Sequence, residues 1–223
     1  MRETFNKELS LLTESTIRMV SLVREMVQKA TQALVEQDVA LAQQVIAQDR
    51  EVDELEVQIE SDAVALIARQ QPVGADLRFI FTVIKALTDL ERAGDYATHV
   101  AEDAAILAKE PPLKNYITLP RMGLNLVAML DLLAKALAER DLSVAKDVLA
   151  RDDEIDGLYE EVTRELLTYM LEDPRTITKA LTLMRVARSY ERLGDHLENV
   201  SERIVFWLTG RTEKRPEEPT TPL

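Results

Sequence analysis

Cysteine is absent from this chain of 223 residues. Its absence excludes disulfide bonds, thiolate chemistry and sulfur-ligated metals, and it is typical of a cytoplasmic protein. Aromatic residues make up only 4% of the sequence and glycine occurs six times, so the chain has few of the residues that build strands and tight turns. Histidine occurs only twice, which leaves carboxylates as the main supply of metal ligands.

The sequence also lacks an apolar run of about 18 residues, the length that a membrane-spanning helix needs. Its first residues, MRETFNKELSLL, are polar and amphipathic, and they have no long apolar core of the kind found in secretory signals. The formal net charge of -13 argues against a nucleic acid partner, because phosphate backbones attract basic surfaces. We therefore expect a cytoplasmic protein with no direct membrane insertion and no nucleic acid partner.

Helix-forming residues dominate what is present, above all Ala, Leu, Glu, Arg and Gln. Apolar residues recur three and four positions apart, which is the spacing of helices that bury one face. Breaks that contain proline divide these periodic stretches, as at QPVG in 71–74 and at Pro111–Pro112. The pattern predicts six helices, at roughly 4–36, 39–70, 74–109, 116–139, 142–171 and 175–209.

The two halves of the sequence repeat each other. Residues 33–53 and 136–156 are identical at ten of 21 aligned positions, and LERAGDY at 90–96 matches YERLGDH at 190–196. We interpret the chain as two copies of a three-helix unit, with short links that favour antiparallel neighbours. The predicted fold is all-α: two tandem antiparallel three-helix bundles in 1–110 and 111–210, followed by a disordered tail in 211–223.

Acidic residues four positions apart occur in equivalent helices of the two copies. This spacing places both side chains on one helix face, about 5–6 Å apart, where like charges repel. Neighbouring helices would bring two such pairs together, and clustered carboxylates need a counter-charge. Oxygen ligands suit a hard metal ion or a multinuclear cluster of Fe, Mn, Mg or Ca. The predicted metal ligands are Asp49, Asp53, Glu91 and Asp95 in the first copy and Asp152, Asp156, Glu191 and Asp195 in the second.

A second interpretation is that arginines neutralise a solvated acidic face through pairs three or four residues apart. The arginines beside the acids are Arg50, Arg92, Arg151 and Arg192. The two histidines do not form the Glu-x-x-His pairs of ferritin-like di-iron sites, and we interpret both as surface or packed residues.

Each E-R-x-G-D motif holds a glycine inside a predicted helix, at Gly94 and Gly194. Glycine in a helix interior costs about 1 kcal/mol relative to alanine. We therefore expect a neighbouring helix or a bound group to approach the backbone at both positions.

Several segments resemble the PhoU family. They are Phe5, Glu8 and Leu9, similar to its opening F-x-x-E-L; QQPVGADLRFI at 70–80, similar to its Q-P-V-x-x-D-L-R segment; and DLERAGDYA at 89–97 with YERLGDHLENVSE at 190–202, similar to its paired E-R-x-G-D-H-x-x-N-I-x-E signatures. The chain departs from the first signature at Tyr96 and His99, where the family often has His and Asn.

The resemblance implies a fold of two three-helix bundles, in which the paired acidic motifs of some members hold multinuclear metal clusters. It also implies a non-enzymatic regulator. Such proteins act with a phosphate ABC transporter, here through its ATPase subunit, and with a membrane sensor histidine kinase, and they keep the phosphate-starvation response off when phosphate is plentiful. A homodimer is expected on the same basis. From the residues alone, a carboxylate-bridged oxidase or metal-storage bundle and a metal-free helical adaptor stay open as alternatives.

Overall fold

The computed structural model describes residues 2–211, and all regular structure in this range is helical. The elements are α1 (Arg2–Glu36), α2 (Val39–Gln70), α3 (Gly74–Leu107), α4 (Thr118–Glu139), α5 (Leu142–Glu172), the 3-10 turn η1 (Pro174–Thr176) and α6 (Ile177–Thr209). The predicted all-α fold with six α-helices is confirmed. Within the same range, no helix combines the length and the apolarity that crossing a membrane requires. The predicted disordered tail lies outside the described residues, except for its first residue.

Aspartates set where three of these elements begin. Asp38 and Asp141 cap α2 and α5 by accepting hydrogen bonds from backbone N–H groups of the first turn. Asp173 does the same for the N–H of Arg175, at 3.0 Å, but Pro174 then opens a 3-10 turn in place of an α-helical one. For this reason α6 begins two residues later than the sequence pattern predicted.

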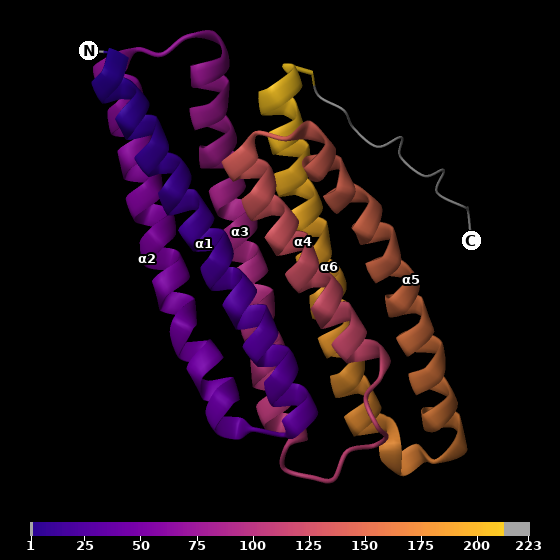
Figure 1. The fold of residues 1–223 in the computed structure, drawn as a ribbon. Coiled ribbons are helices and arrows are strands. Elements are labelled where there is room, and N and C mark those ends of the chain that lie inside the picture. Colours follow the sequence, from indigo (N-terminus) through magenta and orange to yellow (C-terminus); the bar gives the residue numbers. More distant parts are fainter. Residues whose placement is uncertain (1, 212–223) are drawn as a thin grey trace.

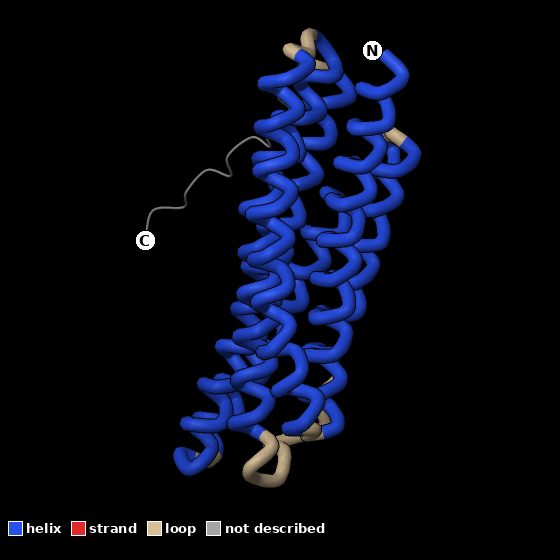
Figure 2. The backbone as a smooth tube through the Cα atoms, turned by 90° about the vertical axis from the view of Figure 1, so that its left-hand side faces the viewer, coloured by secondary structure: helices blue, strands red, loops and turns tan. Residues whose placement is uncertain are grey.

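The helices form two three-helix units that lie side by side (Figure 1). Helices α1, α2 and α3 pack on one another, as do α4, α5 and α6. The units meet where α1 packs on α4 and where α3 packs on α6, so α2 and α5 lie at the outer edges. All helices run along one long direction, and the connections gather at the two ends (Figure 2). The boundary predicted between residues 110 and 111 falls in the connection 108–117 and stays a prediction as a domain boundary.

One apolar core extends through both units. Met19 of α1 and Leu90 of α3 are fully buried in it. The rings of Phe79 and Trp207, with centroids 4.6 Å apart, join α3 to the end of α6. Trp207 is 7% exposed and anchors this end of the core by packing.

The contact between α3 and α6 is antiparallel and contains buried polar groups. Asp103, near the end of α3, is 7% exposed and forms an ion pair with Arg185, near the start of α6. In the middle of the contact, His196 Nδ1 lies 3.0 Å from Asp89 Oδ1, and Asn199 Nδ2 donates to the same oxygen at 3.2 Å. These bonds tie together residues that are separated by about a hundred positions in the sequence.

A pseudo-two-fold axis relates the two units and passes near Tyr96 and His196. These residues occupy equivalent positions in the repeat, and their rings stack with centroids 5.7 Å apart and an interplanar angle of 27°. Two equivalent residues can contact each other only close to such an axis. Exchanging the units therefore maps the contact of Asp89 with His196 onto the pair Ser189 and Tyr96.

Candidate functional site

The two E-R-x-G-D motifs adopt the same side-chain geometry on α3 and α6. Arg92 Nη1 lies 3.2 Å from Asp95 Oδ2, and Arg92 Nε lies 3.5 Å from Glu91 Oε2. In α6 the equivalent arginine repeats both contacts, at 3.1 Å to Asp195 and 3.6 Å to Glu191. Each motif thus supplies a positive charge to its own pair of acids, as the arginine interpretation predicted for Arg92 and Arg192.

Burial raises the pKa of Glu91, whose side chain is 22% exposed. The charge of Asp95 raises this pKa further, Arg92 lowers it in part, and Glu56 and Asp53 of α2 raise it again. Acids from α2 therefore act on the leading glutamate of α3. In the first copy, three of the predicted ligands, Asp53, Glu91 and Asp95, therefore lie close enough for their charges to interact.

The second copy repeats this arrangement. Burial is again the largest cause of the raised pKa of Glu191, followed by the charge of Asp195. Arg188 and Arg192 lower the pKa, and Asp156 of α5 raises it. In both copies the structure brings the second acid of the second helix near the acids of the third helix, as predicted from their spacing.

The other two predicted ligands, Asp49 and Asp152, have different neighbours although their positions are equivalent. Asp49 is half-buried and accepts a hydrogen bond from Thr98 Oγ1 at 3.0 Å. Asp152 is only 2% exposed and lies against the backbone of α6. The residue equivalent to Thr98 is Glu198, whose carboxylate cannot donate such a bond when ionised.

Gly194 leaves room for the neighbouring helix, which is one of the two explanations expected from the sequence, and Gly94 faces the neighbouring helix at a longer distance. A Cβ at position 94 would lie 3.4 Å from a methyl carbon of Val52 in α2. At position 194 it would lie 2.8 Å from Asp152 Oδ1 and 3.5 Å from a methyl carbon of Ile155 in α5. A side chain would therefore collide with α5 only at position 194, whereas at position 94 it would make an ordinary contact with α2.

Within residues 2–211, no group of three or more acidic or histidine side chains is arranged to hold a metal ion. The chemistry of the donors still fits a hard cation, because burial and, after it, the charges of neighbouring acids raise the pKa of both leading glutamates. In addition, Glu191 Oε2 is buried without a hydrogen bond to any described residue. The arginine of each motif stands where a cation would act as counter-charge. The eight ligand assignments stay predictions.

A family model described as the PhoU domain matches residues 16–104 and, again, residues 119–204. The chain belongs to the PhoU family. The two matched stretches correspond to the two three-helix units, so the internal repeat is a repeat of the PhoU domain.

Relatives with this family name match over nearly the whole chain. A phosphate-specific transport system accessory protein PhoU homolog of Deinococcus radiodurans is 47% identical over 96% of this chain and 100% of its own length. A homolog of the same description from Aquifex aeolicus is 45% identical over 83% of this chain and 84% of its own. The crystal structure of PhoU from Pseudomonas aeruginosa superposes with a TM-score of 0.89, at 36% identity, and covers 93% of this chain and 100% of that one.

The contacts between the two PhoU domains escaped sequence reasoning. Asp89, Asp103 and Arg185 were not predicted as contact residues, because each lies about a hundred residues from its partner and matches no short motif. A signal was available in the repeat itself: Asp89 aligns with Ser189, so one copy carries a carboxylate where the other has a hydroxyl.

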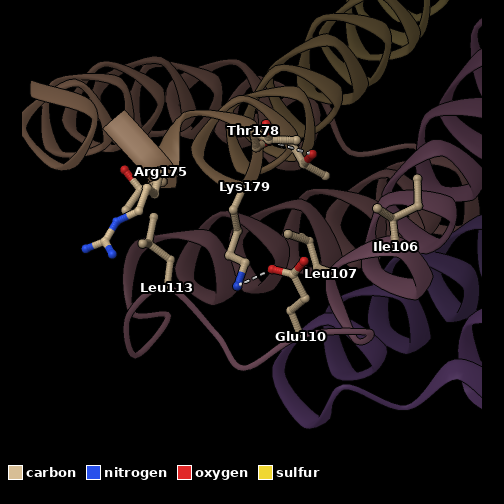
Figure 3. A pocket seen from close by; sticks show the side chains of 9 residues that line it. Ile106, Leu107, Glu110, Leu113, Arg175, Thr178 and Lys179 are labelled. Atoms are coloured by element: carbon tan, nitrogen blue, oxygen red, sulfur yellow. Dashed lines mark hydrogen bonds and ion pairs between the residues drawn. The ribbon is translucent and has the colours of Figure 1, made fainter. Parts of the chain in front are cut away.

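A pocket of about 390 Å³ at one end of this PhoU fold contains none of the predicted ligands. It is formed by the end of α3, the following connection and the start of α6 (Figure 3). Lys179 extends across it to Glu110, with an ion-pair distance of 3.0 Å, and its Nζ donates to the carbonyl of Pro111 at 2.6 Å. Because Lys179 already forms an ion pair with Glu110 within the protein, we propose no ligand for this pocket.

Proposed function

We propose that this protein is a non-enzymatic regulator of phosphate uptake and of the phosphate-starvation response. The observation that carries the proposal is the match of the PhoU domain to both units. It is supported by the Deinococcus radiodurans relative, which aligns over its whole length and is named as a homolog of a phosphate-specific transport system accessory protein. The corresponding structure from Streptococcus pneumoniae, titled a phosphate transport system regulatory protein, has a TM-score of 0.88 at 28% identity, covering 95% of this chain and 100% of that one.

The partners in this proposal are the ATPase subunit of a phosphate ABC transporter and a membrane sensor histidine kinase, which the protein contacts from the cytoplasm. Exposed apolar side chains support docking of other proteins. Leu77 and Phe81 at the start of α3 are 39% and 51% exposed, and their equivalents Ile177 and Leu181 in α6 are 40% and 50% exposed. Both units thus present an apolar pair at the same place.

Metal binding is a separate part of the proposal. Asp53, Glu91 and Asp95 would hold a hard cation in the first unit, and the equivalent acids would do so in the second, with Asp49 and Asp152 as further ligands. Such a cation would offset the burial and the repulsion that together raise the pKa of the leading glutamates. We favour a regulatory or structural metal over an oxidase, because the predicted ligand set contains only carboxylates, and metal oxidases usually include histidine ligands.

The regulatory function is tested in cells of the source organism that lack the gene. With phosphate plentiful, a reporter driven by a phosphate-starvation promoter should be active in these cells, and the chain supplied in trans should silence it. Affinity capture of the chain from phosphate-replete cells should recover the transporter ATPase and the sensor kinase. A reporter that stays silent in the deletion strain would overturn the proposal.

We also propose a homodimer, on the basis of the family resemblance and the broad helical faces. Light scattering should give twice the 25.2 kDa mass of one chain at micromolar concentration. A monomer mass over this range would contradict the dimer without affecting the regulatory function.

A further inference from the structure

A cleft of about 410 Å³ lies between α3 and α6, beside the pseudo-two-fold axis. This volume is within the range of small-molecule sites in proteins. The polar and charged residues that line it are His99, Glu102 and Asp103 of α3 and Arg185, Arg188 and Ser189 of α6. None of the eight predicted metal ligands is among them.

The equivalent place on the other side of the axis is filled by the protein itself. There the Asp89 carboxylate, 15% exposed, lies between α3 and α6 and is bonded by His196 and Asn199. Because α3 and α6 are antiparallel, exchanging the units maps Asp89 onto Ser189. The same exchange maps Asn199 onto His99.

Ser189 is shorter than aspartate and carries no charge, so the carboxylate of the first side has no counterpart in the cleft. Ser189 is 8% exposed, and its hydroxyl has no hydrogen-bond partner among residues 2–211. His99 is exposed and touches the ring of Tyr96 edge-on, and it makes no hydrogen bond to a described residue. Two polar groups that can donate therefore border the space where a carboxylate is missing.

The charges around the cleft are close to balanced. Asp103 is neutralised by Arg185, which bonds both of its carboxylate oxygens. Arg188 Nη1 lies 3.5 Å from Glu191 Oε1, longer than a normal hydrogen bond, and the Arg188 side chain, which is also hydrogen-bonded to Tyr159, is half-exposed. Glu102 is exposed at the rim. Arg188 is thus the cation best able to meet an incoming negative group.

We propose that this cleft binds a small oxyanion, whose oxygens take the place that the Asp89 carboxylate fills on the other side of the axis. Ser189 and His99 donate hydrogen bonds to it, and Arg188 supplies the charge. Because Glu102 and the paired Asp103 oppose a negative ligand, the affinity is expected to be on the order of millimolar. The proposal does not depend on the metal sites or on the regulatory function.

The test uses the two histidines of the full chain as probes in a proton NMR titration at fixed pH and ionic strength. Inorganic phosphate, sulfate and acetate should each shift the His99 ring resonances with a saturating curve. His196, already bonded to Asp89, is the internal reference and should move less. Chloride at matched ionic strength should produce no saturating shift.

Two sets of variants locate the binding. Ser189→Asp rebuilds the missing carboxylate and should abolish the anion-dependent shift of His99. Arg188→Gln should weaken binding roughly tenfold, the loss of one charge-assisted hydrogen bond. The matched control Arg50→Gln removes the same charge at an exposed position of α2 that does not line the cleft, and it should leave the affinity unchanged. Glu102→Gln should tighten binding about twofold.

Several outcomes would overturn the proposal. They are a linear response of His99 to every oxyanion, equal shifts of His99 and His196, and equal losses in Arg188→Gln and Arg50→Gln. Retained binding in a folded Ser189→Asp variant would also overturn it. If that variant does not fold, the comparison of the two arginine variants decides the question alone.

Discussion

Asp49 and Asp152 occupy equivalent positions in the repeat, yet only the second is fully buried. Thr98 donates a hydrogen bond to Asp49 and holds it at a half-buried position. The second copy has a glutamate at the position of Thr98, and there the aspartate packs against Gly194. The presence or absence of the Thr98 donor therefore accompanies a different packing of the equivalent aspartates. As a result, Gly94 and Gly194 differ in the space that a side chain would have.

Alanine substitution should expose this difference. Gly94→Ala should stabilise the protein by up to about 1 kcal/mol, because alanine favours the helix and the new methyl group meets Val52 at an ordinary contact distance. Gly194→Ala should gain less or destabilise, since its methyl group would lie 2.8 Å from Asp152 Oδ1. Urea denaturation followed by circular dichroism measures both. Equal effects would contradict the packing described at Gly194.

The leading glutamates should make stability depend on pH. Their pKa is raised in the folded state, so the folded protein binds protons more tightly than the unfolded chain. Their contribution is therefore most favourable below the ordinary value of 4.5 and declines as pH rises through the folded pKa. Glu91→Gln and Glu191→Gln should each raise the free energy of unfolding at pH 7, and with it the melting temperature, because the neutral amide avoids the cost of burying a charge and removes repulsion of about 0.2–0.5 kcal/mol per pair.

Thermal melts from pH 3.5 to 8 test this, and the advantage of each variant should vanish at the acidic end. Glu160→Gln, at an exposed position of α5, is the control and should change little. An advantage that stays constant across the range would show that packing, and not charge, is responsible.

Sequence reasoning at this scale predicted the acids and the arginines but not how far each acid is buried. The spacing of Glu91, Arg92 and Asp95 within one helix determines that they meet. Contacts such as Thr98 with Asp49 depend instead on the rotation of one helix against another, which the spacing leaves open. The glycine signal was informative because a costly residue inside a helix needs a packing reason.

Among the elements, the six α-helices were predicted within two residues at every end. Helix breaks and apolar periodicity are local features, so they can be recognised in the sequence alone. The packing of α3 on α6 as the central contact between the units is not determined by local sequence. It depends on the total surface that each pairing buries, and the antiparallel register then brings Asp103 to Arg185.

Removing that arginine should weaken the contact between the units. Arg185→Ala leaves the Asp103 carboxylate buried without its cation, and the expected loss is about 1–3 kcal/mol, the cost of an unsatisfied buried group. Arg185→Lys should recover part of it. Arg164→Ala, which breaks an exposed pair with Glu160, should cost less than about 0.5 kcal/mol. Chemical denaturation gives these values, and similar losses for the two alanine variants would contradict a buried role for Asp103.

For the whole molecule, the duplication predicts two independent metal sites. Glu91→Ala combined with Asp95→Ala should abolish metal binding in the first unit only, and the protein should stay folded because both residues lie at the edge of the core. Metal stoichiometry by elemental analysis should fall to half of the wild-type value. The equivalent change at Glu191 and Asp195 is the matched control and should remove the other half.

Full stoichiometry in the first variant, beside a wild type that binds metal, would show that these carboxylates are not ligands. The motif would then be a packing element whose arginine neutralises it. Absence of hard-metal binding in the wild type would lead to the same conclusion and would leave the regulatory proposal untouched.

The connection 108–117 is the single covalent tether between two units that resemble the halves of a dimer. A short tether holds its ends at an effective concentration on the order of millimolar, so the units associate without the entropy cost of meeting in solution. The contact between α3 and α6 is thereby freed from having to supply a high affinity of its own. The contact can therefore contain polar groups such as Asp89, and a cleft at the equivalent residue Ser189. A moderate loss of contact energy there is expected to change the alignment of the two units before it separates them.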